Sequence, residues 1–194
     1  MAHYFDESPT TPSAPAEVRL EQEGLLLRTD RGVFSHGRLD PGTFLLLRAA
    51  PPLPPTGTLL DLGSGAGPIA LTMAHRAPQA TVWAVDVNER ARSLTAANAA
   101  ANGLANVIVA APEDVTSDLR FDVIWSNPPI RVGKPALHAL LTMWLDRLAD
   151  GGHAVLVVQR HLGADSLQRW LTDHGHLADR LASSRGYRLL AVHR

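Results

Sequence analysis

The clearest chemical signal in the sequence is an acidic residue followed by glycines at every second position, namely Asp61, Gly63, Gly65 and Gly67. The apolar run before it, residues 58–62, has the length and composition of a buried strand, and residues 69–77 are typical of a helix. Glycines in such a turn let the backbone approach a ligand closely and adopt φ angles that other residues avoid. The segment therefore predicts a ligand cradle at the carboxyl end of a parallel sheet.

The spacing of these glycines argues against the common phosphate-binding turns. A dinucleotide pattern G-x-G-x-x-G/A that starts at Gly63 meets Pro68, and one that starts at Gly65 lies inside the expected helix. The phosphate-loop pattern needs a lysine, and the only lysine of the chain is Lys134. Asp61 would repel a pyrophosphate but can face a cationic ligand. A tight turn without a ligand is the alternative.

Two further acidic positions follow the next strands expected along the chain. Asp86 closes the strand at 81–85, where an acid can accept hydrogen bonds from ribose hydroxyls. Asp114, or its neighbour Glu113, follows the strand at 107–110, where a polar group can reach the amino edge of an adenine. Carboxyl ends of parallel strands share one edge of the sheet, so these residues are expected near the glycine turn. The alternative for each is an acid that only caps a loop.

Asn127, Pro128 and Pro129 follow the strand expected at 121–125, about 60 residues after the glycine turn. Two successive prolines fix φ and remove two N–H donors, which leaves carbonyl oxygens and the asparagine side chain as hydrogen-bond acceptors. Methylation of an exocyclic amine needs such acceptors, because the nitrogen lone pair is otherwise delocalised into the ring. The displacement then depends mainly on positioning and electrostatic preorganisation.

Repeated alternation of strand and helix predicts a Rossmann-like α/β fold, a doubly wound, seven-stranded, mostly parallel sheet with an antiparallel final strand. A short hairpin around Glu23-Gly24 and a helix capped by Asp40 and opened by Pro41 lead into it. The leucine and tryptophan stripe from Leu137 to Leu148 predicts a core-facing helix that ends at residues 150–152. Later strands are expected at 154–158, 177–182 and 187–192, with a helix at 164–174.

Composition sets the class of protein. The chain of 194 residues suits one α/β domain, and we expect a flexible lead-in at 1–15 followed by a single domain at 16–194. Cysteine is absent, and the histidines lack a ligand spacing, so no metal site is expected. No apolar run approaches the roughly 20 residues that span a bilayer. The first residues lack the features of a signal peptide, which makes the cytoplasm the expected location.

Charge is unevenly distributed along the chain. Residues 1–130 hold nine arginines against 14 acidic residues, whereas residues 131–194 hold nine basic residues against five aspartates. A basic C-terminal third can meet a phosphate backbone. The candidate phosphate contacts are Arg38, Arg131, Lys134 and Arg160. Each of them can equally be an ordinary surface charge.

Together these motifs resemble those of a known family. The glycine turn resembles motif I of the S-adenosylmethionine-dependent methyltransferases, and Asn127 to Ile130 resembles the N-P-P motif of the class I enzymes that modify planar nitrogens. The runs at 32–35 and 39–47 resemble the small-domain methyltransferases, typified by the small-subunit ribosomal RNA guanine-N2 enzyme. Many members carry an aromatic residue that stacks on the target base where this chain has Ile130. Stacking is then lost, or supplied by Phe34 or Trp125.

The resemblance implies specific roles. S-adenosylmethionine would be held by Asp61, Gly63, Gly65, Gly67, Asp86 and Asp114. Asn127 and Pro128 would hold the target amine. Substrate contacts would come from Phe34, Arg38, Ile130 and Arg131.

The expected function is therefore N-methylation of the exocyclic N2 amine of guanine, with ribosomal RNA or the small ribosomal subunit as partner. Methylation of a protein glutamine or a DNA adenine stays open, since the N-P-P motif serves all three. A non-catalytic module that binds RNA or the cofactor also stays open. The sequence gives no oligomeric state.

Overall fold

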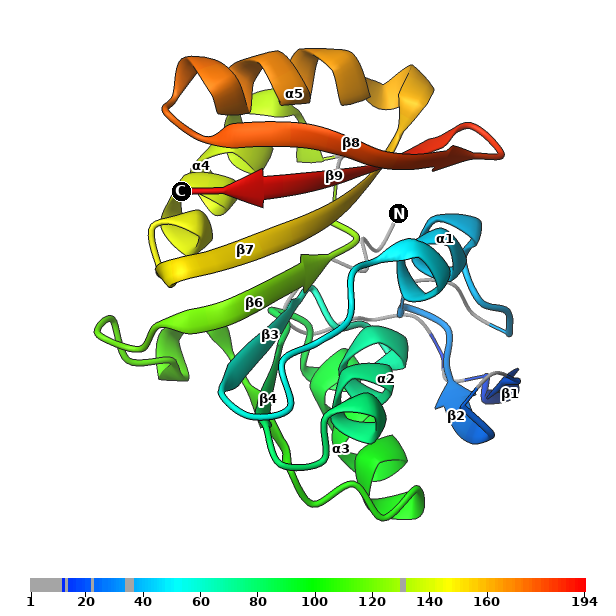
Figure 1. The fold of residues 1–194 in the computed structure, drawn as a ribbon. Coiled ribbons are helices and arrows are strands. Elements are labelled where there is room, and N and C mark those ends of the chain that lie inside the picture. Colours follow the sequence, from blue (N-terminus) through cyan, green and yellow to red (C-terminus); the bar gives the residue numbers. More distant parts are fainter. Residues whose placement is uncertain (1–11, 13, 22, 34–36, 130–131) are drawn as a thin grey trace.

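In the described residues of the computed structural model (12, 14–21, 23–33, 37–129 and 132–194), seven strands form one central sheet (Figure 1). Their order is β5-β4-β3-β6-β7-β9-β8. The strands are β3 (Thr58–Leu62), β4 (Thr81–Val85), β5 (Val107–Ala110), β6 (Phe121–Ser126), β7 (Leu148–Gln159), β8 (Leu177–Ser184) and β9 (Tyr187–His193). Strands β3 to β7 pair in parallel, and β9 is antiparallel to both of its neighbours, as the sequence predicts.

The strand order reverses beside β3. From β3 the chain continues outward through β4 and β5, and it then returns to β6 on the other side of β3. In open α/β sheets a reversal of this kind opens a crevice at the carboxyl ends of the strands, which is where ligands bind. The glycine turn follows β3 and the Asn-Pro-Pro segment follows β6, so both flank this crevice.

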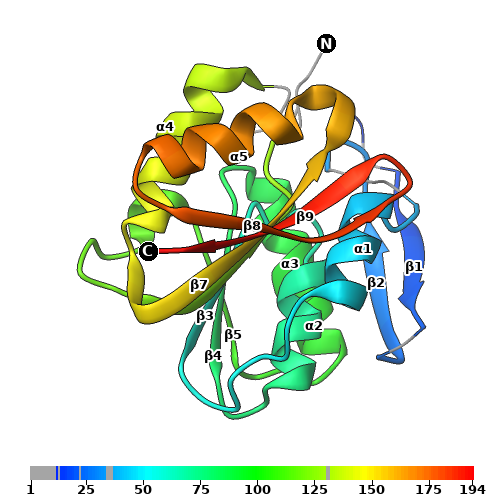
Figure 2. The same cartoon turned by 45° about the horizontal axis from the view of Figure 1, so that its top comes forward.

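Helices cover both faces of the sheet (Figure 2). One face carries α1 (Pro41–Ala49), α2 (Pro68–Arg76) and α3 (Glu89–Ala101), and the other carries α4 (Lys134–Leu145) and α5 (Ala164–Asp173). Short 3₁₀ turns, η1 (Pro112–Asp114) and η3 (Arg160–Leu162), follow β5 and β7. Each face has its own apolar cluster, as expected for strands that are buried on both sides.

The N-terminal hairpin, β1 (Ala16–Leu20) and β2 (Leu25–Thr29), forms a separate two-stranded sheet. Asn98 on α3 and Asn102, the C-cap of that helix, hydrogen-bond through their side-chain amides to the backbone of Arg28 and Leu26, so they pair with the edge of β2 as another strand would. Asn98 also donates to the carbonyl of Ala66. The hairpin is thus attached to α3 and to the glycine turn.

One predicted boundary is wrong. Helix α4 ends at Leu145, and residues 150–152, expected to stop the helix, lie inside β7. Leu148 is the first residue of β7 and is fully buried. Because it is apolar and falls at the helical spacing, it made the predicted helix extend past its true end. Gly152 fits a bulge in the β6–β7 pairing, because a Cβ there would lie 2.9 Å from the carbonyl oxygen of Phe121.

The helices that the structure describes are all too short or too polar to cross a bilayer. The same part of the chain holds no group of three or more histidine and acidic side chains arranged to bind a metal ion.

Candidate active site

A cavity of about 570 Å³ lies at the carboxyl edge of β3, β4 and β6. This volume is within the usual range for small-molecule sites. One part of its wall comes from the glycine turn and the strand beside it, including Gly63, Ser64, Gly65, Asp86 and Val87. The other part comes from α1 and the end of β6, including Asp40, Thr43, Asn127, Pro128 and Pro129. The two strongest motifs of the sequence therefore face one continuous space.

Backbone hydrogen bonds and the φ angles of its glycines shape the start and the end of the glycine turn. The N–H groups of Gly63 and Ser64 donate to the carbonyl of Val85, which ties the turn to the neighbouring strand. Gly67 has a φ of 90° and precedes α2 as its N-cap. A Cβ on Gly67 would lie 2.8 Å from Leu71 Cδ1 and 3.0 Å from Thr95 Cγ2. Gly67 is thus required both by its φ angle and by the close approach of α2 and α3.

Asp61 lies behind the cavity wall and is fully buried. Its Oδ2 accepts a hydrogen bond of 2.8 Å from the backbone N–H of Ala70, so it holds the first turn of α2 against β3. Its Oδ1 is buried without a partner among the described residues. Burial, offset in part by the Ala70 hydrogen bond, raises the pKa of Asp61 to about 8. The direct contact with the cofactor expected of Asp61 stays a prediction.

Asp86 lines the cavity and holds the middle of the glycine turn. Its Oδ2 accepts from the N–H of Gly65 at 2.8 Å, and its Oδ1 accepts from the N–H of Asn88 at 2.9 Å. Burial raises the pKa of Asp86, although these two hydrogen bonds and the charge of Arg92 oppose the shift. A carboxylate at this place has lone pairs that can accept hydrogen bonds from ribose hydroxyls.

The remaining predicted cofactor position has a different placement. Asp114 ends η1 with an exposed side chain and is not part of the cavity wall, whereas Pro112 of the same turn is. The role expected of Asp114 stays a prediction.

On the opposite side of the cavity, the Asn127 side chain is held by α1. Its Nδ2 donates to Asp40 Oδ2 at 2.9 Å and to Thr43 Oγ1 at 3.1 Å. Just before it, Ser126 Oγ donates to the carbonyl of Leu62 at 2.7 Å, which joins the ends of β6 and β3. Pro128 and Pro129 complete this edge with backbone that has no N–H to donate. We call residues 127–129 the Asn-Pro-Pro rim.

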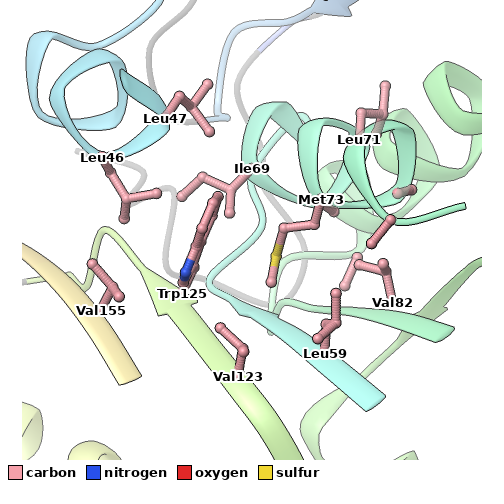
Figure 3. Packing of buried hydrophobic residues seen from close by; sticks show 14 of the residues in the cluster. Leu46, Leu47, Leu59, Ile69, Leu71, Met73, Val82, Val123, Trp125 and Val155 are labelled. Atoms are coloured by element: carbon pink, nitrogen blue, oxygen red, sulfur yellow. The ribbon is translucent and has the colours of Figure 1, made fainter. Parts of the chain in front are cut away.

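Of the predicted substrate residues, Arg38 lines the cavity, whereas Phe34, Ile130 and Arg131 lie outside the described residues. The suggestion that Trp125 stacks on the target base is wrong. Trp125 is fully buried among Leu46, Ile69 and Val155, on the face that α1 and α2 cover (Figure 3). Its ring therefore belongs to the core.

Sequence reasoning missed the part that α1 plays. Asp40 was expected to cap this helix, and it does so by accepting from the N–H groups of Gly42 and Thr43. Its second role, as a partner of Asn127, was not expected. The sequence does carry a sign of crowding there, since glycine is unfavourable inside a helix. A Cβ on Gly42 would lie 2.7 Å from the ring of Tyr187, which also lines the cavity.

The residues present fit a nucleoside cofactor that carries hydroxyl and amino donors. Ser64 Oγ is buried at the cavity wall without a partner among the described residues, and Asp61 Oδ1 is similarly unpartnered just behind the turn. Asp86 adds an acceptor where a ribose is expected, and no basic group is part of the turn. These groups suit hydroxyl and amino donors and do not suit a pyrophosphate.

Comparison with known proteins agrees with this geometry. The family described as "Methyltransferase small domain" matches residues 24–191. The protein YbxB of Bacillus subtilis is 36% identical over 169 residues, which is 84% of each chain. Ribosomal RNA small subunit methyltransferase C of Pseudomonas entomophila is 37% identical over 150 residues, which is 75% of this chain and 45% of that protein. The chain thus spans about half the length of the latter relative.

Among solved structures, the fold is similar to the T. thermophilus 16S rRNA N2 methyltransferase RsmC in complex with AdoMet and guanosine. The TM-score is 0.74 at 25% identity, over 96% of this chain and 52% of that one. A ribosomal protein L11 methylase from Lactobacillus delbrueckii has a TM-score of 0.61 at 21% identity, covering 92% of this chain and 98% of the other, which shows a shared fold only. The fold alone therefore does not decide the substrate.

Proposed function

Because the chain belongs to the methyltransferase small-domain family and is an S-adenosylmethionine-dependent methyltransferase, we propose that it methylates the exocyclic N2 amine of a guanine in small-subunit ribosomal RNA. The observation that carries the proposal is the single cavity that joins the glycine turn to the Asn-Pro-Pro rim. The family match supports a single methyltransferase domain at 16–194, and most of the expected lead-in at 1–15 lies outside the described residues.

When bound, S-adenosylmethionine supplies an electrophilic methyl group, and the turn of Gly63, Gly65 and Gly67 with Asp61 and Asp86 is the place we assign to it. The glycines allow close approach of the backbone to the ligand. Asp86 supplies acceptors for the ribose, and Asp61 fixes the start of α2. The role that we assign to Asp114 is a more distant contact at the adenine edge.

On the other side of the cavity, Asn127 and the rim carbonyls accept hydrogen bonds from the target amine. Accepting both N–H groups favours a pyramidal nitrogen, whose lone pair is then available for attack. The new N–C bond would form as the S–C bond of the donor breaks, and the nitrogen then becomes acidic, so it can release its proton to water and no strong base is needed beforehand. The work of the rim is orientation, which can supply a large part of the rate enhancement.

Basic groups near the cavity mouth support a nucleic-acid substrate. Arg160 follows Gln159, a cavity residue, and its backbone N–H donates to the carbonyl of Gly186 at 2.7 Å. That contact brings the turn between β8 and β9, with Arg185, to the end of β7. Arg160 and Arg185 are both exposed, and Tyr187 beside this turn lines the cavity. Positive charges in this position can bind phosphates and orient an RNA without reading its sequence.

The named relatives support the same substrate. RsmC from T. thermophilus is described with AdoMet and guanosine, and the Pseudomonas relative is named as a small-subunit ribosomal RNA enzyme. This chain spans about half of either protein. We therefore assign to it the methyl transfer itself and no role that depends on the unmatched half of those proteins.

The proposal is tested by incubating the protein with isotope-labelled S-adenosylmethionine and three acceptors: free 16S rRNA, small ribosomal subunits, and a mixture of DNA and protein. Digested nucleosides and peptides are then identified by mass spectrometry. We expect labelled N2-methylguanosine from at least one of the two ribosomal acceptors and none with Asn127→Ala. Label confined to adenine in DNA or to glutamine in protein would overturn the RNA proposal.

A further inference from the structure

The Asn127 amide is fixed in orientation by groups outside its own motif. Both hydrogens of its Nδ2 are engaged, one by Asp40 Oδ2 at 2.9 Å and one by Thr43 Oγ1 at 3.1 Å. Asp40 lies 87 residues earlier in the chain, at the start of α1. Asn127 lines the cavity, so with its donors occupied the group that it offers to a ligand is the acceptor Oδ1.

The chemistry of Asp40 excludes the flipped amide. An ionised carboxylate only accepts hydrogen bonds, so an amide oxygen turned toward it would face a like partial charge. Oδ2 of Asp40 also accepts from the N–H of Gly42 at 2.8 Å and of Thr43 at 3.0 Å. The N-terminus of a helix favours a negatively charged side chain, so a carboxylate acceptor suits this position.

Asp40 is itself held tightly. It is 9% exposed, and the Tyr187 hydroxyl donates to its other oxygen at 3.4 Å. The Tyr187 ring lies so close to Gly42 that no side chain larger than hydrogen fits there without movement. With partners on both of its oxygens, the carboxylate is held where it faces the Asn127 amide, and it thereby sets the orientation of that amide.

We propose that Asp40 is a positioning residue that fixes the oxygen of the Asn127 amide toward the acceptor, so that the site selects groups that donate N–H bonds. Thr43 shares this task. Amines and primary amides then fit the rim, whereas a ring nitrogen that carries only a lone pair meets an acceptor and is rejected. The proposal rests on the N-methyltransferase function above and adds how that chemistry is selected.

The discriminating variants separate the helix cap from the contact to Asn127. Asp40→Ser keeps a good N-cap, but its short side chain does not reach Asn127. In Asp40→Asn the new amide oxygen can replace Oδ2 as the acceptor for Gly42, Thr43 and Asn127. The new NH2 group then faces the Tyr187 hydroxyl, whose oxygen can accept a hydrogen bond. Thr43→Val removes the second acceptor with little change of shape. The matched control is Asp122→Ser, because the Asp122 carboxylate also accepts a backbone N–H, that of Thr58, at the opposite end of the sheet.

The first readout does not require activity. We expect the ¹⁵N-labelled side-chain amide of Asn127, assigned by its absence in Asn127→Ala, to exchange its hydrogens slowly in the wild type. Exchange should become fast in Asp40→Ser, intermediate in Thr43→Val, and stay slow in Asp40→Asn and Asp122→Ser. Slow exchange in folded Asp40→Ser would overturn the proposal, as would fast exchange in the wild type.

The second readout is kinetic. Asp40→Ser should lower kcat by roughly 100-fold, the size of effect that a small misplacement of a reacting group produces. Affinity for S-adenosylhomocysteine should stay within about twofold, and Asp40→Asn should recover kcat to within about tenfold of wild type. Equal losses of kcat in Asp40→Ser and Asp122→Ser would reduce Asp40 to a stability role and contradict the proposal.

The two proposals can fail separately. If the wild type methylates an amine or amide other than guanine N2, the assigned substrate is wrong while the Asp40 test proceeds on the new acceptor. If Asp40→Ser is too unstable to study, the other two variants still test the proposal. Unchanged amide exchange and turnover in Thr43→Val, together with fast exchange and lost turnover in Asp40→Asn, would contradict it.

Discussion

The glycine turn and the Asn-Pro-Pro rim face the same cavity but are built differently. The turn is held by backbone hydrogen bonds to Val85, by the carboxylates of Asp61 and Asp86, and by side-chain donors on α3 that lie at most 32 residues away, Thr95 and Asn98. The rim depends on side-chain contacts from Asn127 to Asp40 and Thr43, 84 to 87 residues away. The contacts that hold the turn therefore come from nearby segments of the chain, whereas those that hold the rim join segments far apart in sequence.

This difference matches the tasks that we assign. A cofactor of constant structure can be bound by a turn whose backbone is rigid and whose side chains are few. An acceptor must be oriented and distinguished from similar groups, which requires side chains of fixed hydrogen-bond polarity. Variants should therefore separate into those that affect donor binding and those that affect transfer.

The largest effect is expected for Asn127→Ala. Removing an acceptor that is used in the transition state should lower kcat by about 100- to 1000-fold, with donor affinity unchanged. Single-turnover transfer measures the first quantity, and the protection of the protein by donor against heat measures the second. The control is Asn106→Ala, because Asn106 also holds backbone carbonyls, those of Ala74, Ala77 and Ala80, but lies away from the cavity. An equal loss of kcat in Asn106→Ala would contradict a specific role of Asn127 in methyl transfer.

Gly67→Ala should impair the glycine turn, the half of the site that we assign to the donor. Its φ of 90° and the 2.8 Å approach of Leu71 leave no room for a methyl group, so α2 must shift and donor affinity should fall roughly 10- to 100-fold. Gly103→Ala is the matched control, since Gly103 has a φ of 68° but nothing within 4 Å of an added Cβ. We expect Gly103→Ala to lose only about 1–2 kcal/mol of stability from backbone strain, with normal donor affinity. Thermal melts with and without S-adenosylhomocysteine check both, and equal donor affinities would contradict the account.

A smaller effect is expected for the double variant Arg160→Ala, Arg185→Ala. Loss of two phosphate contacts should raise the KM for RNA by about 10-fold at low salt and reduce the slope of log K against log salt by about two. Donor affinity and kcat at saturating RNA should not change. Arg120→Ala serves as control, because Arg120 is exposed just before β6, at the amino ends of the parallel strands and away from the cavity. An RNA affinity of the double variant that equals the wild type at every salt concentration would place the RNA elsewhere.

The smallest effect concerns the pH dependence of stability through Asp61. Its pKa is about 8 in the folded protein against a usual 3.8, so the folded state retains a proton that the unfolded chain releases. Its contribution to stability is therefore complete below pH 3.8 and is lost as pH rises toward 8. Asp61→Asn keeps the acceptor for Ala70 and cannot ionise.

We accordingly expect the difference in melting temperature, Asp61→Asn minus wild type, to grow by roughly 3 °C or more between pH 5 and pH 8. Calorimetry without donor measures it. A difference that stays constant over this range would show that Asp61 does not titrate there.

Local motifs account for what could be predicted from the sequence. The strand, turn and helix around Gly63, the cap at Asp40 and the position of Asp86 follow from neighbouring residues, and the sheet follows from their alternation. Trp125 could not be placed in this way. Strands buried on both faces give no alternation between polar and apolar residues, so nothing local shows which face a side chain occupies.

The contact between Asp40 and Asn127 was beyond sequence reasoning for a different reason. Each residue has a sufficient local explanation, one as a helix cap and the other as a member of the N-P-P motif, and their meeting depends on how α1 packs against β7 and β9. Similarly, Leu148 fits the helical spacing of apolar residues, but in the structure it lies in a strand and is buried there.

The most direct test of the division between the two halves is a calorimetric titration with S-adenosylhomocysteine of the wild type, Gly67→Ala and Asn127→Ala. The account predicts one site per chain in the wild type, the same affinity in Asn127→Ala, and weak or no binding in Gly67→Ala. No heat from the folded wild type, or loss of affinity in Asn127→Ala equal to that in Gly67→Ala, would contradict it.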